Sequence, residues 1–170
     1  MIKPVFVAAL LSMGVAAAAP AIQLAQAQTA KPANAKSEFV RMAASGDMFE
    51  IESSKLALGK SDDAAVKKFA QMLIDDHTAA SKKLMSMSDE KPPAAMDKKH
   101  MDMLEKLKSA DGKQFTQLFV SMQLQAHKEA VDLFESYSKN GDDAKLKSFA
   151  SETLPRLRAH LQEAQKLQKS

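Results

Sequence analysis

The chain of 170 residues contains no cysteine and no tryptophan, and it has a single tyrosine. Without cysteine it can form neither a disulfide bond nor a cysteine-type zinc site, and it cannot use a thiolate as a nucleophile. Its 24 basic and 21 acidic residues are interspersed, and it has little to stack on bases, so we expect no nucleic-acid partner. The sequence also lacks a glycine-rich phosphate loop, a GxSxG motif and an HExxH motif, so it predicts no catalytic or cofactor-binding residues of these kinds.

Residues 1–27 are typical of a secretory signal peptide. Lys3 supplies the positively charged start, residues 5–19 form the apolar stretch, and residues 25–27 (AQA) form a small-x-small cleavage site. The apolar stretch is shorter than the roughly 20 strongly apolar residues of a membrane span, which argues against the alternative of an uncleaved anchor. We therefore expect an exported protein in the periplasm or at the outer membrane, with no transmembrane segment after cleavage.

A short linker over residues 28–36 precedes a domain over residues 37–169 that is helical almost throughout. Apolar residues recur there at spacings of three and four, as on the buried face of a helix. Pro92 and Pro93 interrupt the pattern, and a shorter helix is predicted over 96–109. No useful length of the domain alternates with period two, so we predict an all-α fold. The four long helices are expected at about 37–59, 61–87, 113–138 and 142–168.

The second and fourth long helices repeat one another. The segment SDDAAVKKFA (61–70) matches GDDAKLKSFA (141–150) at six of ten positions, and HTAASKKL (77–84) pairs with HLQEAQKL (160–167) after a three-residue insertion. The chain therefore divides into two helical hairpins joined by a long connection. If that connection crosses the bundle, the fold is a ferritin-like antiparallel four-helix bundle, and the crossover carries the short helix. Simple up-down packing with a surface excursion is the alternative.

Four polar residues, one on each long helix, fall on predominantly apolar faces: Glu50, His77, His127 and His160. A buried carboxylate or imidazole is costly unless it is hydrogen-bonded or ligated. Three interpretations follow: a polar layer without a cofactor, a site for a transition metal such as zinc, copper or iron, or histidines that never meet. Asp75 and Asp76 are expected to turn away from His77, and at best one of them pairs with a lysine of a neighbouring helix.

A second candidate site lies in the crossover, where MDKKHMDM (96–103) holds Met96, His100, Met101 and Met103. Thioethers together with an imidazole are suitable ligands for Cu(I) or Ag(I). Methionine also fills gaps where a short helix packs on a bundle, and this structural role is the alternative.

Four segments of the chain resemble the bacterial family called domain of unknown function 4142: FVRMAASGDMFEIESSKLAL, VKKFAQMLIDDHTAASKKL, QAHKEAVDLFESYS and LPRLRAHLQEAQKL. The resemblance covers residues 37–168 and implies an exported protein, often labelled a putative membrane or outer-membrane protein, with a ferritin-like fold. It implies no activity. The di-iron sites of ferritin-like proteins use Glu-x-x-His, whereas Ile74, Leu124 and Leu157 lie three residues before the helical histidines, so we expect no ferroxidase chemistry.

The sequence favours a non-enzymatic binding or envelope-stress domain with a buried Glu/His layer, no cofactor, and a partner in the cell envelope. The alternative is a metal-binding or metal-dependent redox protein that uses this layer.

Overall fold

The computed structural model describes residues 35–169; the predicted signal peptide (1–27) and the linker as far as residue 34 lie outside the described residues. Five helices and no strand occur in the described part, so the prediction of an all-α fold is confirmed. Within the same part, no helix combines the length and the apolar composition needed to cross a membrane. The helices are α1 (Ala35–Lys60), α2 (Ala64–Met87), α3 (Lys98–Lys108), α4 (Gly112–Asn140) and α5 (Ala144–Leu167).

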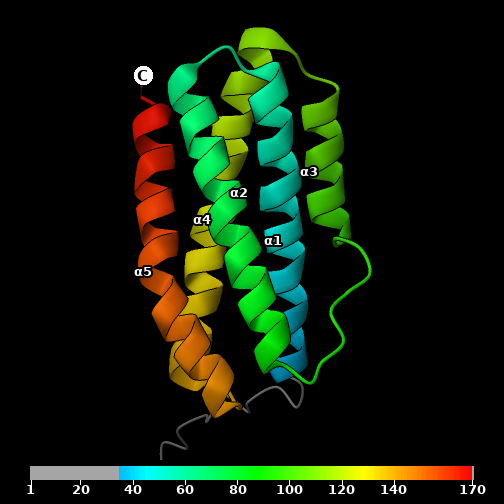
Figure 1. Ribbon diagram of the computed structural model, residues 1–170, viewed down its shortest axis with the longest axis vertical. Coiled ribbons are helices and arrows are strands. Elements are labelled where there is room, and N and C mark those ends of the chain that lie inside the picture. Colours follow the sequence, from blue (N-terminus) through cyan, green and yellow to red (C-terminus); the bar gives the residue numbers. More distant parts are fainter. Residues whose placement is uncertain (1–34, 170) are drawn as a thin grey trace, which may run out of the picture. The chain divides into compact units, whose positions relative to one another are not determined.

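The four long helices lie side by side, and each packs against two others (Figure 1). α1 and α2 form one antiparallel hairpin, and α4 and α5 form another. The connection after α2 holds both adjacent prolines, and it runs back along the molecule so that α4 starts at the same end as α2. α3 lies within this connection and packs against α1 and α4. Consequently α2 and α4 run in the same direction, and the α1–α4 and α2–α5 contacts form opposite sides of the arrangement.

The repeat seen in the sequence determines where α2 and α5 begin. The Asp63 carboxylate accepts hydrogen bonds from the backbone N–H groups of residues 65 and 66, at 2.8 and 3.2 Å. Asp143 does the same for residues 145 and 146, at 2.9 and 3.1 Å. An aspartate at this position satisfies N–H groups that have no partner inside the helix, so both helices start at the same point of the repeat.

The apolar core is divided into two clusters, one towards each end of the long helices. On α2, α4 and α5, one histidine separates residues of one cluster from residues of the other: His77, His127 and His160. Asp47 has the corresponding position on α1. A polar layer therefore crosses the middle of the core. The large residues of the first cluster include Phe49, Phe69, Leu73, Leu107, Phe115 and Phe119, and those of the second include Phe39, Leu84, Phe134, Tyr137, Leu146, Phe149 and Leu157.

Candidate metal centre

Three histidines from three helices meet in the polar layer: His77 of α2, His127 of α4 and His160 of α5. Their exposed fractions are 5%, 1% and 1%. The ring centroids form a nearly equilateral triangle with sides of 5.5, 5.4 and 5.2 Å. One ligand nitrogen from each ring lies within 4.8 Å of the other two. We call these three residues the trihistidine centre.

Each ring of the trihistidine centre has one nitrogen that is hydrogen-bonded to a group outside the triangle. His77 Nδ1 lies 2.8 Å from Asp47 Oδ1, and His127 Nδ1 lies 2.9 Å from the backbone oxygen of Gln123. His160 Nε2 lies 2.9 Å from an oxygen of Asp76. Carboxylate and carbonyl oxygens only accept hydrogen bonds, so each of these outer nitrogens is the donor.

The three remaining nitrogens therefore carry lone pairs when the rings are neutral. His127 Nε2 and His160 Nδ1 are 3.3 Å apart, although neither holds a proton in that state. His77 Nε2 is buried and has no hydrogen-bond partner within residues 35–169. Lone pairs that converge in this way repel one another until a proton or a cation lies between them, so the centre is chemically suited to a metal ion.

The three histidines fall into two groups by the direction of their pKa shifts, because burial lowers all three values and only at His77 do carboxylates outweigh it. Burial lowers the pKa of His127 well below its ordinary value, and charge on His77 and His160 would lower it further. Burial also lowers the pKa of His160 to about 4, although Asp76 opposes the shift. For His77, burial is outweighed by the hydrogen bond to Asp47 and by neighbouring carboxylates, so its pKa is raised. At neutral pH, His127 and His160 are thus uncharged, and His77 is the ring that holds a proton most readily.

Glu50 lies in the same layer, but beside the outer side of His127. Its Oε1 is 3.6 Å from His127 Nδ1, whereas the convergent nitrogen of that ring is Nε2. Its Oε2 is buried without a hydrogen-bond partner within the described residues. Burial raises the pKa of Glu50 to about 8 even though positive charge on His77 opposes the shift. The structure thus brings three of the four predicted residues into one triangle and puts the fourth next to it.

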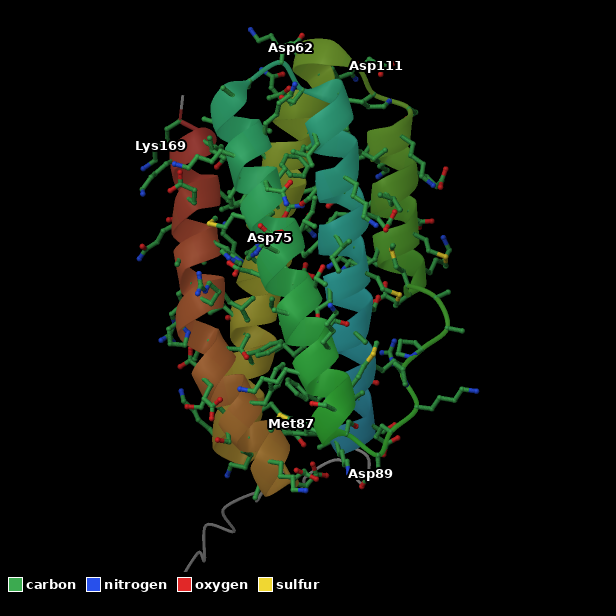
Figure 2. The ribbon with its side chains drawn as sticks, in the orientation of Figure 1. Asp62, Asp75, Met87, Asp89, Asp111 and Lys169 are labelled. Atoms are coloured by element: carbon green, nitrogen blue, oxygen red, sulfur yellow. The ribbon has the colours of Figure 1, made fainter. Side chains whose placement is uncertain are left out.

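The expectation that Asp76 at best pairs with a lysine was wrong. Its carboxylate contacts His160 of α5 and lies 3.4 Å from Arg156 Nη1 of the same helix. Asp76 precedes His77 by one residue, so the two side chains leave α2 about 100° apart around its axis. At that angle Asp76 faces the neighbouring helix α5. Asp75 is exposed on α2 and accepts a hydrogen bond from Gln71 at 2.9 Å (Figure 2).

The sequence analysis missed Asp47, the partner of His77. It lies four residues after Ala43 and three before Glu50, which is the spacing of a single helix face, so a signal was present. Gln123 was also missed; besides its backbone oxygen, its side-chain amide donates to Ser53 Oγ at 2.9 Å. These residues extend the polar layer around the centre.

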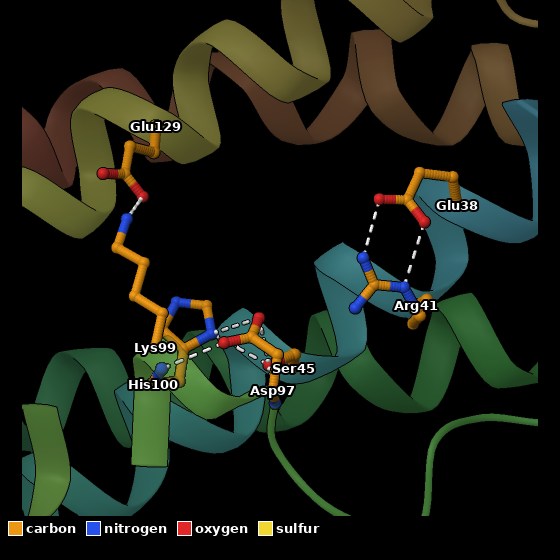
Figure 3. Close-up of polar contacts among 7 residues, drawn as sticks. All are labelled: Glu38, Arg41, Ser45, Asp97, Lys99, His100 and Glu129. Carbon is orange, nitrogen blue, oxygen red and sulfur yellow. Dashed lines mark hydrogen bonds and ion pairs between the residues drawn. The ribbon is translucent and has the colours of Figure 1, made fainter. Parts of the chain in front are cut away.

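The side chains of the second candidate site, in the crossover, differ in their exposure and in their contacts. Met103 is buried in the first apolar cluster, Met96 packs against that cluster, and Met101 is 44% exposed on α3. His100 Nδ1 lies 2.8 Å from Ser45 Oγ and 3.0 Å from Asp97 Oδ2 (Figure 3). Met96 and Met103 therefore share the first apolar cluster, whereas Met101 faces solvent.

A cavity of about 70 Å³ adjoins the trihistidine centre. Its lining includes Asp47, Glu50 and Asp76 as well as all four histidines of the chain, because His100 of α3 also borders it. The volume is several times what one water molecule needs, so an ion with an additional small ligand fits.

The sequence pattern of the family described as Domain of unknown function (DUF4142) matches residues 21–167. The chain belongs to this family. No curated protein matches this DUF4142 chain. Among solved structures, CopM in the Cu(II)-bound form is similar, with 19% identity, a TM-score of 0.65, and coverage of 77% of this chain and 93% of that one.

CopM in the Ag-bound form is similar to the same extent, with 20% identity, a TM-score of 0.62, and coverage of 76% and 92%. A DUF305 fragment from Deinococcus radiodurans has 12% identity, a TM-score of 0.70, and coverage of 80% and 96%. At these identities the similarity shows that the DUF4142 chain shares a helical fold with these proteins.

Proposed function

We propose that this DUF4142 protein is an exported metal-binding protein. It holds one transition-metal ion, for which Cu²⁺ is the first candidate, at His77, His127 and His160. The observation that carries the proposal is the orientation of the rings. Each donates its outer N–H to an oxygen of the protein. One ligand nitrogen of each ring lies within 4.8 Å of those of the other two, so a single ion among the rings can reach all three. Histidines that ligate metals have this arrangement, because the outer hydrogen bond fixes both the tautomer and the orientation of the ring.

A polar layer without a metal explains the contacts less well. In such a layer, donors and acceptors should pair with one another. Yet His77 Nε2 and Glu50 Oε2 are buried without partners within residues 35–169, and both residues border the cavity. An ion would use the lone pair of His77 and would balance the charge of a deprotonated Glu50.

Copper is the first choice because of the chemistry of the ligands. Three imidazoles suit copper and zinc, and Cu²⁺ binds most strongly among the first-row divalent ions to a given set of nitrogen and oxygen ligands. The structures of CopM with Cu(II) and with Ag support testing copper first, since CopM has a similar fold. Glu50 is the candidate fourth ligand among the predicted residues. Iron is less suited, because Glu-x-x-His pairs do not precede these histidines.

The proposed setting is the cell envelope. Residues 1–27 act as a cleaved signal peptide, and a linker joins them to a ferritin-like four-helix domain in the periplasm or at the outer membrane. The domain begins with α1 at Ala35, two residues earlier than the predicted boundary at residue 37. The parallel course of α2 and α4, with a crossover between them, supports the ferritin-like topology. The protein sequesters or carries the ion without enzymatic turnover, and it exchanges the ion with an envelope protein.

Metal analysis of protein purified from the periplasm without chelators tests the proposal. The wild-type protein is expected to contain or to take up one equivalent of copper, and a variant with both His77→Ala and His160→Ala is expected to lose it. Asp75→Asn is the matched control, because Asp75 is exposed and does not border the cavity. Metal at trace level in the wild type, or an equal amount in the double variant, would refute the proposal in favour of a structural layer.

A further inference from the structure

His100 borders the same cavity as the trihistidine centre but belongs to the short helix α3. Its side chain is 12% exposed, and its ring is stacked on Phe49 with the centroids 5.3 Å apart. Ser45 and Asp97 hold its Nδ1, and Ser45 also donates to Asp97 at 3.0 Å (Figure 3). His100 therefore has the same pattern as the three buried histidines: one nitrogen is fixed by protein oxygens, and the other, Nε2, is left for a ligand.

The cavity reaches two opposite sides of the bundle. On the α2–α5 side, its border includes Asp76 and Arg156, and the Asp76 oxygen that binds His160 also lies 3.4 Å from the Arg156 guanidinium. This carboxylate oxygen already has two partners, the imidazole of His160 and the guanidinium of Arg156. The guanidinium of Arg156 lines the cavity here and carries a positive charge that repels an approaching metal cation, whereas on the opposite side Glu129 lines the cavity and Lys99 does not. The α2–α5 side is therefore the less favourable one for access.

On the α1–α4 side, the border includes Met42, Gly46, His100 and Glu129. Met42 is 39% exposed, so its thioether is within reach of solvent. A methyl group in place of the hydrogen of Gly46 would meet no atom within 4 Å, so the space beside this helix position is open. A thioether, an imidazole and a carboxylate on this side are all ligand types for copper.

Glu129, which lines the cavity on this side, forms an ion pair between α4 and α3. Lys99, the residue before His100, binds the Glu129 carboxylate, as Figure 3 shows. Both side chains are about half exposed, and exposed pairs of this kind contribute little to stability. The contact can therefore open at small cost, and opening it frees the Glu129 carboxylate at the edge of the cavity.

We propose that the ion reaches the trihistidine centre from the α1–α4 side, and that His100 is the first buried ligand that it meets. This rests on the function proposed above. The transfer is a ligand exchange without a change of oxidation state: the bond from the metal to His100 Nε2 breaks as bonds to the trihistidine nitrogens form. His100 is then an access ligand, and it is dispensable once the ion is bound.

Rapid mixing of the metal-free protein with Cu²⁺ in stopped flow, followed by the absorbance of the copper–imidazole complex, tests this route. His100→Gln is expected to bind one equivalent at equilibrium but to associate several-fold more slowly, because the entering ion then loses the imidazole ligand on this side. Gly46→Leu, which fills the open space on the same side, is expected to slow association as well. Met101→Gln, on an exposed neighbour outside the cavity, is the control and should associate at the wild-type rate.

The variant Arg156→Gln tests the opposite side, and it should bind no more slowly than the wild type. Wild-type association rates in both His100→Gln and Gly46→Leu would overturn the route, as would slower association in Arg156→Gln. If the wild type takes up no copper, the proposed function itself fails, which is a distinct result. A thermal unfolding scan of each variant separates slow association from loss of folding.

Discussion

Asp76 and His160 are 84 residues apart in the sequence, yet a carboxylate oxygen of the first accepts a hydrogen bond of 2.9 Å from Nε2 of the second. The contact joins α2 of the first hairpin to α5 of the second. It also fixes the tautomer of His160, so that the lone pair of Nδ1 faces His127. A residue at the edge of a helix face thus controls the orientation of a ring in the core.

The first prediction concerns this contact. Asp76→Asn keeps the size of the side chain but removes its charge, and an amide can also present its N–H₂ group to the ring. We expect copper affinity to fall by about 10- to 100-fold, as for other partners of ligating histidines. A competition titration against a chelator of known affinity measures the change. Asp75→Asn is the control; equal affinities for the two variants would contradict the role assigned to Asp76.

The second prediction concerns the protons that copper displaces. Burial raises the pKa of Glu50 to about 8, so most molecules of the metal-free protein carry a proton on Glu50 at pH 7. A cation beside the carboxyl group favours its charged form, and copper binding should therefore release about one proton from Glu50. Calorimetric titrations in buffers with different ionisation enthalpies count the protons. Glu50→Gln should release about one fewer than the wild type; the same number in both proteins would contradict this prediction.

The third prediction concerns stability without metal. The pKa of Glu50 is higher in the folded protein than its ordinary value of 4.5, so the folded state binds this proton more tightly. The resulting stability is fully present below about pH 4.5 and is lost as the pH rises through about 8. At one pKa unit per 1.36 kcal/mol, the loss is at most about 5 kcal/mol.

Replacing the titrating group removes this dependence. Relative to the wild type, Glu50→Gln should therefore gain stability as the pH is raised from 5 to 8.5. Urea denaturation of the two metal-free proteins at several pH values measures the difference in the free energy of unfolding. A difference that stays constant over this range would show that Glu50 titrates normally in the folded state.

The fourth prediction tests the repeat. Asp63 and Asp143 cap α2 and α5 with the same pair of hydrogen bonds, so Asp63→Ala and Asp143→Ala should each destabilise the protein by about 1 kcal/mol. Asp62→Ala, at the residue before the first cap, should have little effect. Chemical denaturation gives the three values. A loss for Asp62→Ala equal to that for Asp63→Ala would mean that general charge, not capping, is responsible.

The helices and the convergence of the histidines could be predicted because both depend on periodicity. Helical spacing assigns His77, His127 and His160 to apolar faces, and in a bundle such faces point at one another. The repeat adds that His77 and His160 have equivalent positions. The structure confirms that these three rings meet.

The groups around the rings could not be predicted in the same way. Asp47 and Asp76 lie at the edges of apolar faces, where a rotation of a few tens of degrees decides between solvent and a neighbouring helix. That rotation is determined by how the helices pack. The crossover presents the same difficulty: its composition indicated a cluster of thioethers, whereas the packing of α3 buries Met103, exposes Met101 and directs His100 to the cavity.

The trihistidine centre draws its residues from both halves of the chain, since His77 belongs to the first hairpin and His127 and His160 belong to the second. An ion bound there would act as a crosslink between segments that are 50 or more residues apart. A crosslink across a long loop stabilises a fold mainly by restricting the unfolded chain. In a chain without cysteine, reversible metal loading would then supply a restraint comparable to that of a disulfide bond, and the metal supply would adjust how firmly the two hairpins are held together.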